Sequence, residues 1–463
     1  MLTISDSTRT GRRNFLRVGS LGLAGMSLPG LLSASRAAGA ESGVLRDHSV
    51  VFVFLHGGPS QMETFDPKMT APSEIRSATG EVKTTIPGVT FGGTFEKLAQ
   101  RADRLSIVRS FTTGDSRHDI KPIVCEDTFN ANLGTVYSRV AGVNRSDNGM
   151  PTNALLFPRS VDPKRQPETK SFGRFDSTGA LGSAFAPFIP GGGGDLQQDM
   201  QLNLPMNRLA DRRTLLNELD RLKFALESSV GSSGLDHLRE QAFSTILGGV
   251  AKAFDLSNEA PETIAKYDTA PLMRPQDIDK KWKNYNNYVD NGMTLGRQML
   301  LARRLCEAGC GFVTVTTNFV WDMHADVNNA GVVEGMRYMG LPLDHALSAF
   351  LDDVHERGLD RKILLVVCGE MGRTPRINAR GGRDHWGGLA PLLLAGGGLP
   401  MGQVIGQSTR DLASPLSEPV TKRHLIATIL HRLFDVGVLR VTRGVPRNIV
   451  QALESWDTIP GLG

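Results

Sequence analysis

Residues 50–55 read Val-Val-Phe-Val-Phe-Leu, and this apolar run stops at His56-Gly57-Gly58-Pro59. A continuous run of β-branched and aromatic residues, without polar alternation, is typical of a strand that is covered on both faces. The glycines and the proline that follow predict a sharp turn. Strands of this kind belong to parallel sheets, so the stretch favours an α/β fold class.

Further apolar runs appear along the chain, each after a stretch with helical spacing. They are residues 105–108 after 95–103, 312–317 after 295–307, and 363–367 after 343–356. Helix followed by strand, repeated, predicts a mostly parallel sheet with crossover connections. Another strand is expected over 391–394 and a late helix over 421–434.

The middle of the chain has a different composition. Residues 151–205 are rich in glycine, proline, serine and aspartate and predict irregular loop, whereas 208–226 and 235–254 carry apolar residues at helical spacing. We therefore expect one main domain over 41–463, with a partly helical insertion over 151–290.

The N-terminus has the three parts of a signal peptide. Arg12-Arg13-Asn14-Phe15-Leu16 precedes a soft apolar stretch over 18–32 and the small residues Ala38-Gly39-Ala40. A membrane anchor or a buried helix is the alternative, but glycines interrupt a stretch shorter than the ~20 residues that a span needs. Residues 1–40 thus predict export by the Tat translocase to the periplasm, and no later segment of the mature chain is apolar enough to be transmembrane.

Charge and cysteine content exclude two classes of protein. Five of the 52 Lys and Arg residues, but only one of the 48 Asp and Glu residues, lie in the first 40 positions, so the remainder is formally neutral. A nucleic-acid partner would require a clustered basic excess, and none is predicted. Four cysteines are too few for a disulfide framework, and Cys368, in an apolar strand, is expected to be buried and inert.

Ionisable side chains gather just after the predicted strands, where ligands bind in open α/β sheets. Carboxylate and imidazole groups in one place suit zinc, manganese or a similar divalent metal. The candidate ligands are Asp322, His324, Glu370, Asp384 and His385. The alternative for each is a loop carboxylate that hydrogen-bonds a nearby histidine or backbone N–H.

Four motifs carry a family resemblance that covers nearly the whole mature chain. They are His56-Gly57-Gly58-Pro59-Ser60-Gln61, Trp321-Asp322-Met323-His324, Gly369-Glu370-Met371-Gly372-Arg373-Thr374-Pro375 and Gly382-Arg383-Asp384-His385-Trp386. With them the chain resembles the bacterial Tat-exported family called domain of unknown function 1501, which is grouped with the alkaline phosphatase and sulfatase superfamily. The resemblance implies a three-layer α/β/α fold with a mixed, mostly parallel sheet.

The resemblance also implies roles for individual residues. Hydrolases of that superfamily place a metal ligand directly after the first strand, where this chain has His56. They place a nucleophile after the second strand, where this chain has Thr113 and Ser116, and a metal-bound water could attack instead. His118 could serve as base or ligand. Arg373 and Arg383 could hold an anion, or instead be structural residues that pin the loop after the fourth strand.

The sequence is compatible with three functions. The first is a hydrolase of phosphate or sulfate esters that uses zinc, manganese or calcium. The second is a non-catalytic periplasmic binding or assembly protein that kept the fold. The third is a protein that binds a sugar through the aromatic residues of the insertion, Trp282, Tyr285 and Tyr288.

Overall fold

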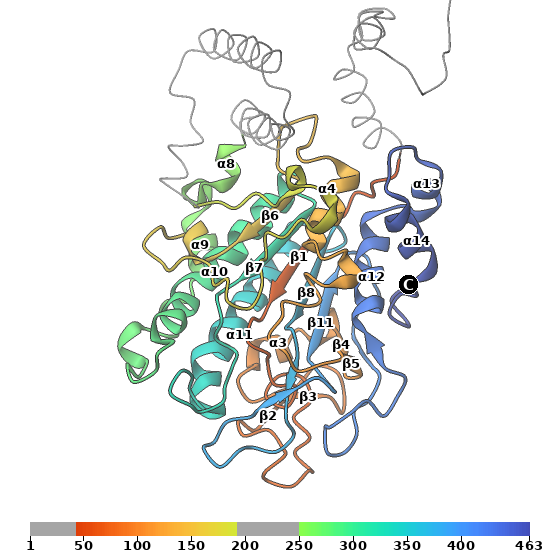
Figure 1. The fold of residues 1–463 in the computed structure, drawn as a ribbon. Coiled ribbons are helices and arrows are strands. Elements are labelled where there is room, and N and C mark those ends of the chain that lie inside the picture. The colour runs from red at the N-terminus through yellow and green to blue at the C-terminus, as the bar shows by residue number, and fades with distance from the viewer. Residues whose placement is uncertain (1–42, 192–249) are drawn as a thin grey trace, which may run out of the picture.

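A computed structural model describes residues 43–191 and 250–463 of the chain. A seven-stranded mixed sheet runs through the centre of the molecule (Figure 1). The central strand β1 (Ser49–Phe54) pairs in parallel with β7 (Phe312–Thr316) on one side and β8 (Ile363–Cys368) on the other. Only β11 (Leu392–Gly396) runs against its neighbours in this sheet, between β8 and β4 (Ser106–Val108). In spatial order the strands are β12 (Gln403–Ile405), β4 (Ser106–Val108), β11 (Leu392–Gly396), β8 (Ile363–Cys368), β1 (Ser49–Phe54), β7 (Phe312–Thr316) and β6 (Asn153–Leu156).

Strand β1 lies in the core with both faces covered, as its sequence predicts. Val51 and Val53 contribute to one apolar cluster, and Phe52 and Phe54 to a second cluster on the other face. Alternate side chains of a strand point to opposite faces, so a run without polar residues is what a doubly covered strand requires.

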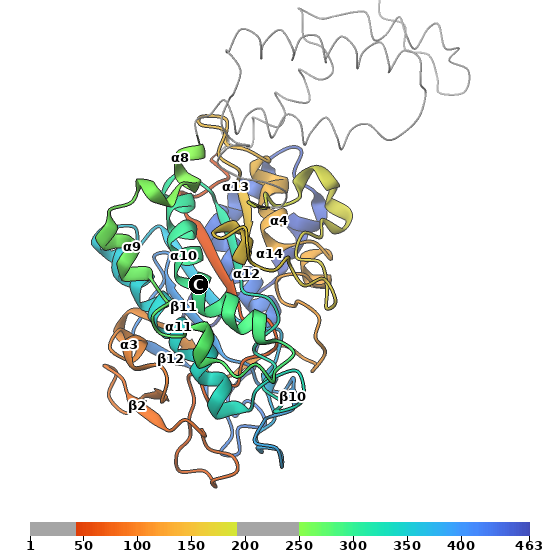
Figure 2. The same cartoon turned by 90° about the vertical axis from the view of Figure 1, so that its left-hand side faces the viewer.

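Helices form the two outer layers. Residues of α3 (Glu96–Ala99), α10 (Tyr285–Glu307) and α11 (Val332–Glu356) pack on the face of Val51, together with α8 (Ala251–Phe254) and α9 (Pro261–Tyr267). The opposite face is covered by α4 (Leu133–Ala141), α12 (Lys422–Leu433), α13 (Val436–Val441) and α14 (Arg447–Ser455) (Figures 1 and 2). The predicted three-layer α/β fold is confirmed. Among the described helices, none is long and apolar enough to cross a membrane.

The start of the predicted insertion belongs to the main sheet. Residues 151–205 are predicted as irregular loop, but β6 forms within them and pairs in parallel with β7. Helix α10 also begins ten residues earlier than the apolar pattern over 295–307 indicates. The helices predicted over 208–226 and most of 235–254, and the signal peptide over 1–40, lie outside the described residues.

The described residues also include three two-stranded sheets and four cysteines with free thiols. β2 (Glu81–Lys83) pairs with β3 (Thr90–Gly92), β5 (Phe111–Thr112) with β13 (Val420–Thr421), and β9 (Gly372–Arg373) with β10 (His385–Trp386). Cys368 lies at the end of β8 and is fully buried, as expected. Cys125, Cys306 and Cys310 are also buried and free.

Asp344 connects α11 to α3, and its carboxyl group makes the stability of the fold depend on pH. Its carboxylate accepts hydrogen bonds from Lys97 N (3.0 Å) and Leu98 N (2.7 Å) in the first turn of α3. Burial nevertheless raises the pKa of Asp344 to about 6, because the side chain is almost completely removed from water. The folded state therefore binds a proton more readily than the unfolded state between about pH 4 and 6.

We expect Asp344→Asn to remove this pH dependence. In the unmodified protein, the contribution of Asp344 to the unfolding free energy is largest below about pH 4 and falls as the pH rises through about 6. Two pKa units correspond to roughly 3 kcal/mol. Urea unfolding at pH 4, 5, 6 and 7 measures this change. The unfolding free energy of the unmodified protein minus that of the variant should fall by about 2 to 3 kcal/mol over this range. A difference that stays constant with pH would contradict the raised pKa.

Candidate metal centre

Loops from three neighbouring strands meet at the carboxyl edge of the sheet. The loops follow β1, β7 and β8, and the short β9–β10 pair extends the last of them. Gly57 allows the first two loops to touch, because a Cβ at its position would lie 2.7 Å from the backbone nitrogens of Trp321 and Asp322. Its φ of +120° is also one that side-chain-bearing residues rarely adopt.

One group of candidate metal ligands, the metal-ligand cluster, consists of His118 from the loop after β5, Asp322 and His324 from the loop after β7, and His385 from the loop after β8. Asp322 Oδ1 lies at its centre. It is 2.9 Å from His324 Nε2, 3.2 Å from His385 Nε2 and 3.4 Å from His118 Nε2. The Nε2 atoms of His324 and His385 are 2.8 Å apart. Three imidazole nitrogens and one carboxylate oxygen thus converge on one point.

Carboxylates behind the cluster fix two of the imidazole rings. His118 Nδ1 lies 3.0 Å from Glu370 Oε1, and His324 Nδ1 lies 3.0 Å from Asp384 Oδ1. A carboxylate can only accept, so each Nδ1 carries a proton, and the tautomer that this selects is the one whose Nε2 lone pair faces the cluster. Glu370 is itself held by Gly57 N, at 2.9 and 3.1 Å from its two oxygens.

Arg373 holds the central carboxylate. Its Nη2 donates to Asp322 Oδ1 at 2.6 Å, and the guanidinium also donates to the carbonyl oxygens of Gly57 and Gly58. Burial by itself would raise the pKa of Asp322, but the Arg373 charge and the three histidines outweigh it and hold this pKa well below its usual range. Asp322 is therefore a carboxylate at any physiological pH.

The pKa values of His118 and His385 are shifted in opposite directions by their surroundings. Burial lowers the pKa of His385, and its hydrogen bond to Asp322 only partly opposes this. For His118 burial acts in the same direction, but Asp322 and Glu370 together raise the pKa above its ordinary value. The two pKa shifts have opposite signs because His118 contacts two carboxylates, whereas His385 contacts one.

The cluster fits a divalent cation, on two observations. His118 Nε2 is buried without a hydrogen-bond partner among the described residues, and His324 Nε2 is 2.9 Å from Asp322 Oδ1 although both are acceptors. The guanidinium of Arg373 contacts both atoms from one side, through Nη2 to Asp322 Oδ1 (2.6 Å) and through Nη1 to His324 Nε2 (3.3 Å), and a proton or a metal ion between them would remove the remaining repulsion. Donors bound about 2.0–2.1 Å from a zinc ion in a tetrahedron are roughly 3.3 Å apart, close to the distances found here. An imidazole-rich set suits zinc better than calcium, which prefers oxygen ligands.

The remaining predicted residues lie outside this cluster. Glu370 and Asp384, predicted as ligands, stand behind it as partners of His118 and His324. His56, also predicted as a ligand, is buried in a box of phenylalanines, with both ring nitrogens unpartnered among the described residues. Burial lowers the pKa of His56 to about 4. Ser116 is exposed on the loop that carries His118.

Arg383 is a structural residue rather than an exposed anion ligand. Its guanidinium is fully buried against Glu63, with Nη2 to Oε1 at 3.0 Å and Nε to Oε2 at 3.2 Å. It also donates to the carbonyl oxygens of Ile75 and Arg76. The pair joins the loop after β1 to the loop that carries Asp384 and His385, which agrees with the structural alternative in the sequence analysis.

Two contributors to the site were missed by the sequence analysis. Lys121 Nζ, only 2 % of whose residue surface is exposed, donates to Asp115 Oδ1 (2.8 Å) and Asp119 Oδ1 (2.5 Å), and so folds the loop around His118. Phe172 stacks on Phe319 with ring centroids 4.2 Å apart, and both rings contact His118. Aspartates that alternate with basic residues over 115–121 were the available signal for Lys121, whereas nothing in the sequence near Phe172 marks that residue.

Of the aromatic residues proposed for sugar binding, Tyr288 is buried, whereas Trp282 and Tyr285 are half-buried and pack against the core. Tyr288 is fully buried and its hydroxyl accepts from Ala330 N at 3.0 Å. Tyr285 donates to Pro275 O, and Trp282 Nε1 donates to Glu334 at 3.3 Å. Their hydrogen bonds explain their presence without a ligand.

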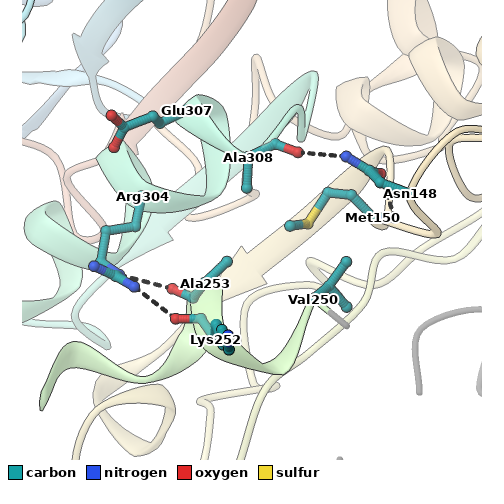
Figure 3. A pocket seen from close by; sticks show the side chains of 8 residues that line it. All are labelled: Asn148, Met150, Val250, Lys252, Ala253, Arg304, Glu307 and Ala308. Carbon is teal, nitrogen blue, oxygen red and sulfur yellow. Dashed lines mark hydrogen bonds between the residues drawn. The ribbon is translucent and has the colours of Figure 1, made fainter. Parts of the chain in front are cut away.

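A hollow of about 350 Å³ lies far from the cluster, between α8 and the end of α10 (Figure 3). Arg304 crosses one wall and donates to the carbonyl oxygens of Lys252 and Ala253. Because α10 leads directly into the start of β7, this hollow lies at the amino edge of the sheet, opposite to the metal-ligand cluster.

Comparison with solved structures finds matches at low identity and low TM-score. A sulfatase from Pseudoalteromonas sp. is 11% identical, with a TM-score of 0.35, over 87% of this chain and 70% of its own. A phosphonate monoester hydrolase from Silicibacter pomeroyi is 11% identical, with a TM-score of 0.33, over 83% and 73%. Comparison with curated protein sequences finds no match. The family described as "Protein of unknown function (DUF1501)" matches residues 47–438, and the chain belongs to this family.

Proposed function

We propose that this protein is a metal-dependent hydrolase of phosphate or sulfate esters, with zinc as the preferred ion. The observation that carries the proposal is the convergence of three imidazole Nε2 atoms on Asp322 Oδ1 at the carboxyl edge of the sheet. The class of ester follows from the resemblance of its motifs to the domain of unknown function 1501 family, which is grouped with the alkaline phosphatase and sulfatase superfamily. Export by the Tat translocase stays a prediction from residues 1–40.

The roles of the chain follow from its contacts. Asp322 and the three histidines would hold the ion, and Glu370 and Asp384 keep His118 and His324 in the tautomer that binds it. A divalent ion supplies Lewis acidity toward the ester. The ligand side chains are 10 to 30 % exposed, so a substrate can reach them. Arg373 is engaged by backbone oxygens, Asp322 and His324, so it positions these two side chains and does not clamp the ester.

Metal content and ester hydrolysis test the proposal together. We expect the purified mature protein to contain about one zinc ion per chain by elemental mass spectrometry and to hydrolyse aryl phosphate or aryl sulfate. Chelation should lower the rate by two orders of magnitude or more, and zinc should restore it, because the ion is the Lewis acid. A folded protein that neither contains nor takes up a divalent ion would favour the binding or assembly role instead.

A further inference from the structure

We infer that His385 is the exchangeable ligand of the metal-ligand cluster, and that it yields its position to the anionic group of a substrate. His118, Asp322 and His324 form the permanent part of the site. The inference rests on the proposed function in one respect, namely that the cluster holds a metal ion.

Each of the three permanent ligands is fixed by a second contact. His118 Nδ1 donates to Glu370, which is completely buried and bound in turn by Gly57 N. His324 Nδ1 donates to Asp384. Asp322 accepts from Arg373, whose side chain is 1 % exposed. Such outer contacts orient a ligand and typically change metal affinity by 10- to 100-fold.

His385 lacks this support. Within residues 43–191 and 250–463, its Nδ1 has no hydrogen-bond partner, and its side chain is the most exposed of the four, at 30 %. Its backbone is held, since β10 pairs with β9 and the neighbouring Trp386 donates through Nε1 to Ala413 O at 2.7 Å. The main chain at His385 is therefore fixed, while the ring is held only by contacts within the cluster.

A hydrolytic centre needs this asymmetry. Structural zinc sites are closed by four protein ligands, whereas catalytic sites keep three and leave a fourth position for water or substrate. Here four side chains converge, so a substrate can bind a four-coordinate ion only if one of them leaves. The ligand without an outer partner and with most access to solvent is the one whose release costs least.

The affinities of three variants for zinc test the assignment. We expect His385→Ala to weaken zinc binding by about 10-fold or less, and His324→Ala or His118→Ala by about 100-fold or more, in competition with a chromogenic chelator. His355→Ala, which removes an exposed histidine of α11, is the matched control and should leave affinity unchanged. Circular dichroism of the metal-free proteins checks that each variant folds.

Cobalt absorption tests the exchange itself, without any turnover. Cobalt-loaded wild type and His385→Ala should differ in their visible spectra, but their spectra at saturating inorganic phosphate should coincide, because His385 is then off the ion in both. Spectra that stay different, or equal losses of zinc affinity in His385→Ala and His324→Ala, would overturn the inference and leave the metal site standing. Failure of wild type to bind any ion would instead refute the proposed function.

Discussion

Replacing Asp322 by asparagine is expected to lower zinc affinity by about 100-fold or more and to abolish ester hydrolysis. Asp322 Oδ1 is the atom that all three imidazole nitrogens approach, at 2.9 to 3.4 Å. Asparagine keeps the shape but removes the charge, and a neutral amide is a poor ligand for a divalent ion beside a guanidinium. Competition titration and elemental analysis measure the loss.

The same substitution has a second, smaller effect. Arg373 would keep its carbonyl partners but lose its carboxylate, so the metal-free variant should be destabilised by about 1 to 3 kcal/mol. Asp326→Asn is the matched control, since Asp326 accepts from the backbone N–H groups of Asn328 and Asn329 and from the side-chain amide of Asn328 at 3.2 Å. Zinc affinity in Asp322→Asn equal to that of the control would contradict the assignment of Asp322 as a ligand.

Replacing Arg383 by methionine is expected to lower the unfolding free energy by about 3 to 5 kcal/mol. The substitution leaves Glu63 buried with a charge and without its cation, which is the costly way to break an internal ion pair. Urea denaturation measures the change. Glu63→Gln/Arg383→Met should recover part of the loss, because no unpaired charge remains.

A neighbouring arginine separates this structural role from anion binding. Arg376 is 75 % exposed, and Arg376→Met should change stability by less than about 0.5 kcal/mol. If Arg383 bound the substrate instead, Arg383→Met would raise KM for the ester and leave the unfolding transition where it was.

The sequence predicts the centre of the fold better than its edges. The continuous run of β1 can only be satisfied by cover on both faces, so the layers follow from it. β6 was missed because four residues in a segment rich in glycine and proline give too short a pattern. The antiparallel direction of β11 is set by its pairing with β4 and β8, which no local pattern records.

The residue types of the site were predictable, but their division of labour was not. Asp322, His324 and His385 were predicted as ligands and the structure brings them together, with His118 from a fourth loop. Whether a carboxylate binds an ion directly or supports a histidine depends on ångström-scale placement. Strand-end position alone therefore cannot separate Asp322 from Glu370.

The four buried, unpaired cysteines can report how often the interior of this protein opens to solvent. Burial raises the pKa of Cys310 to about 12 and places those of Cys306 and Cys368 well above the usual thiol value. A thiol that is neither ionised nor reachable does not react with an alkylating reagent while the sheet is closed. Cys368 in β8 and Cys306 in α10 therefore record, as labelling rates, how often two separate layers open.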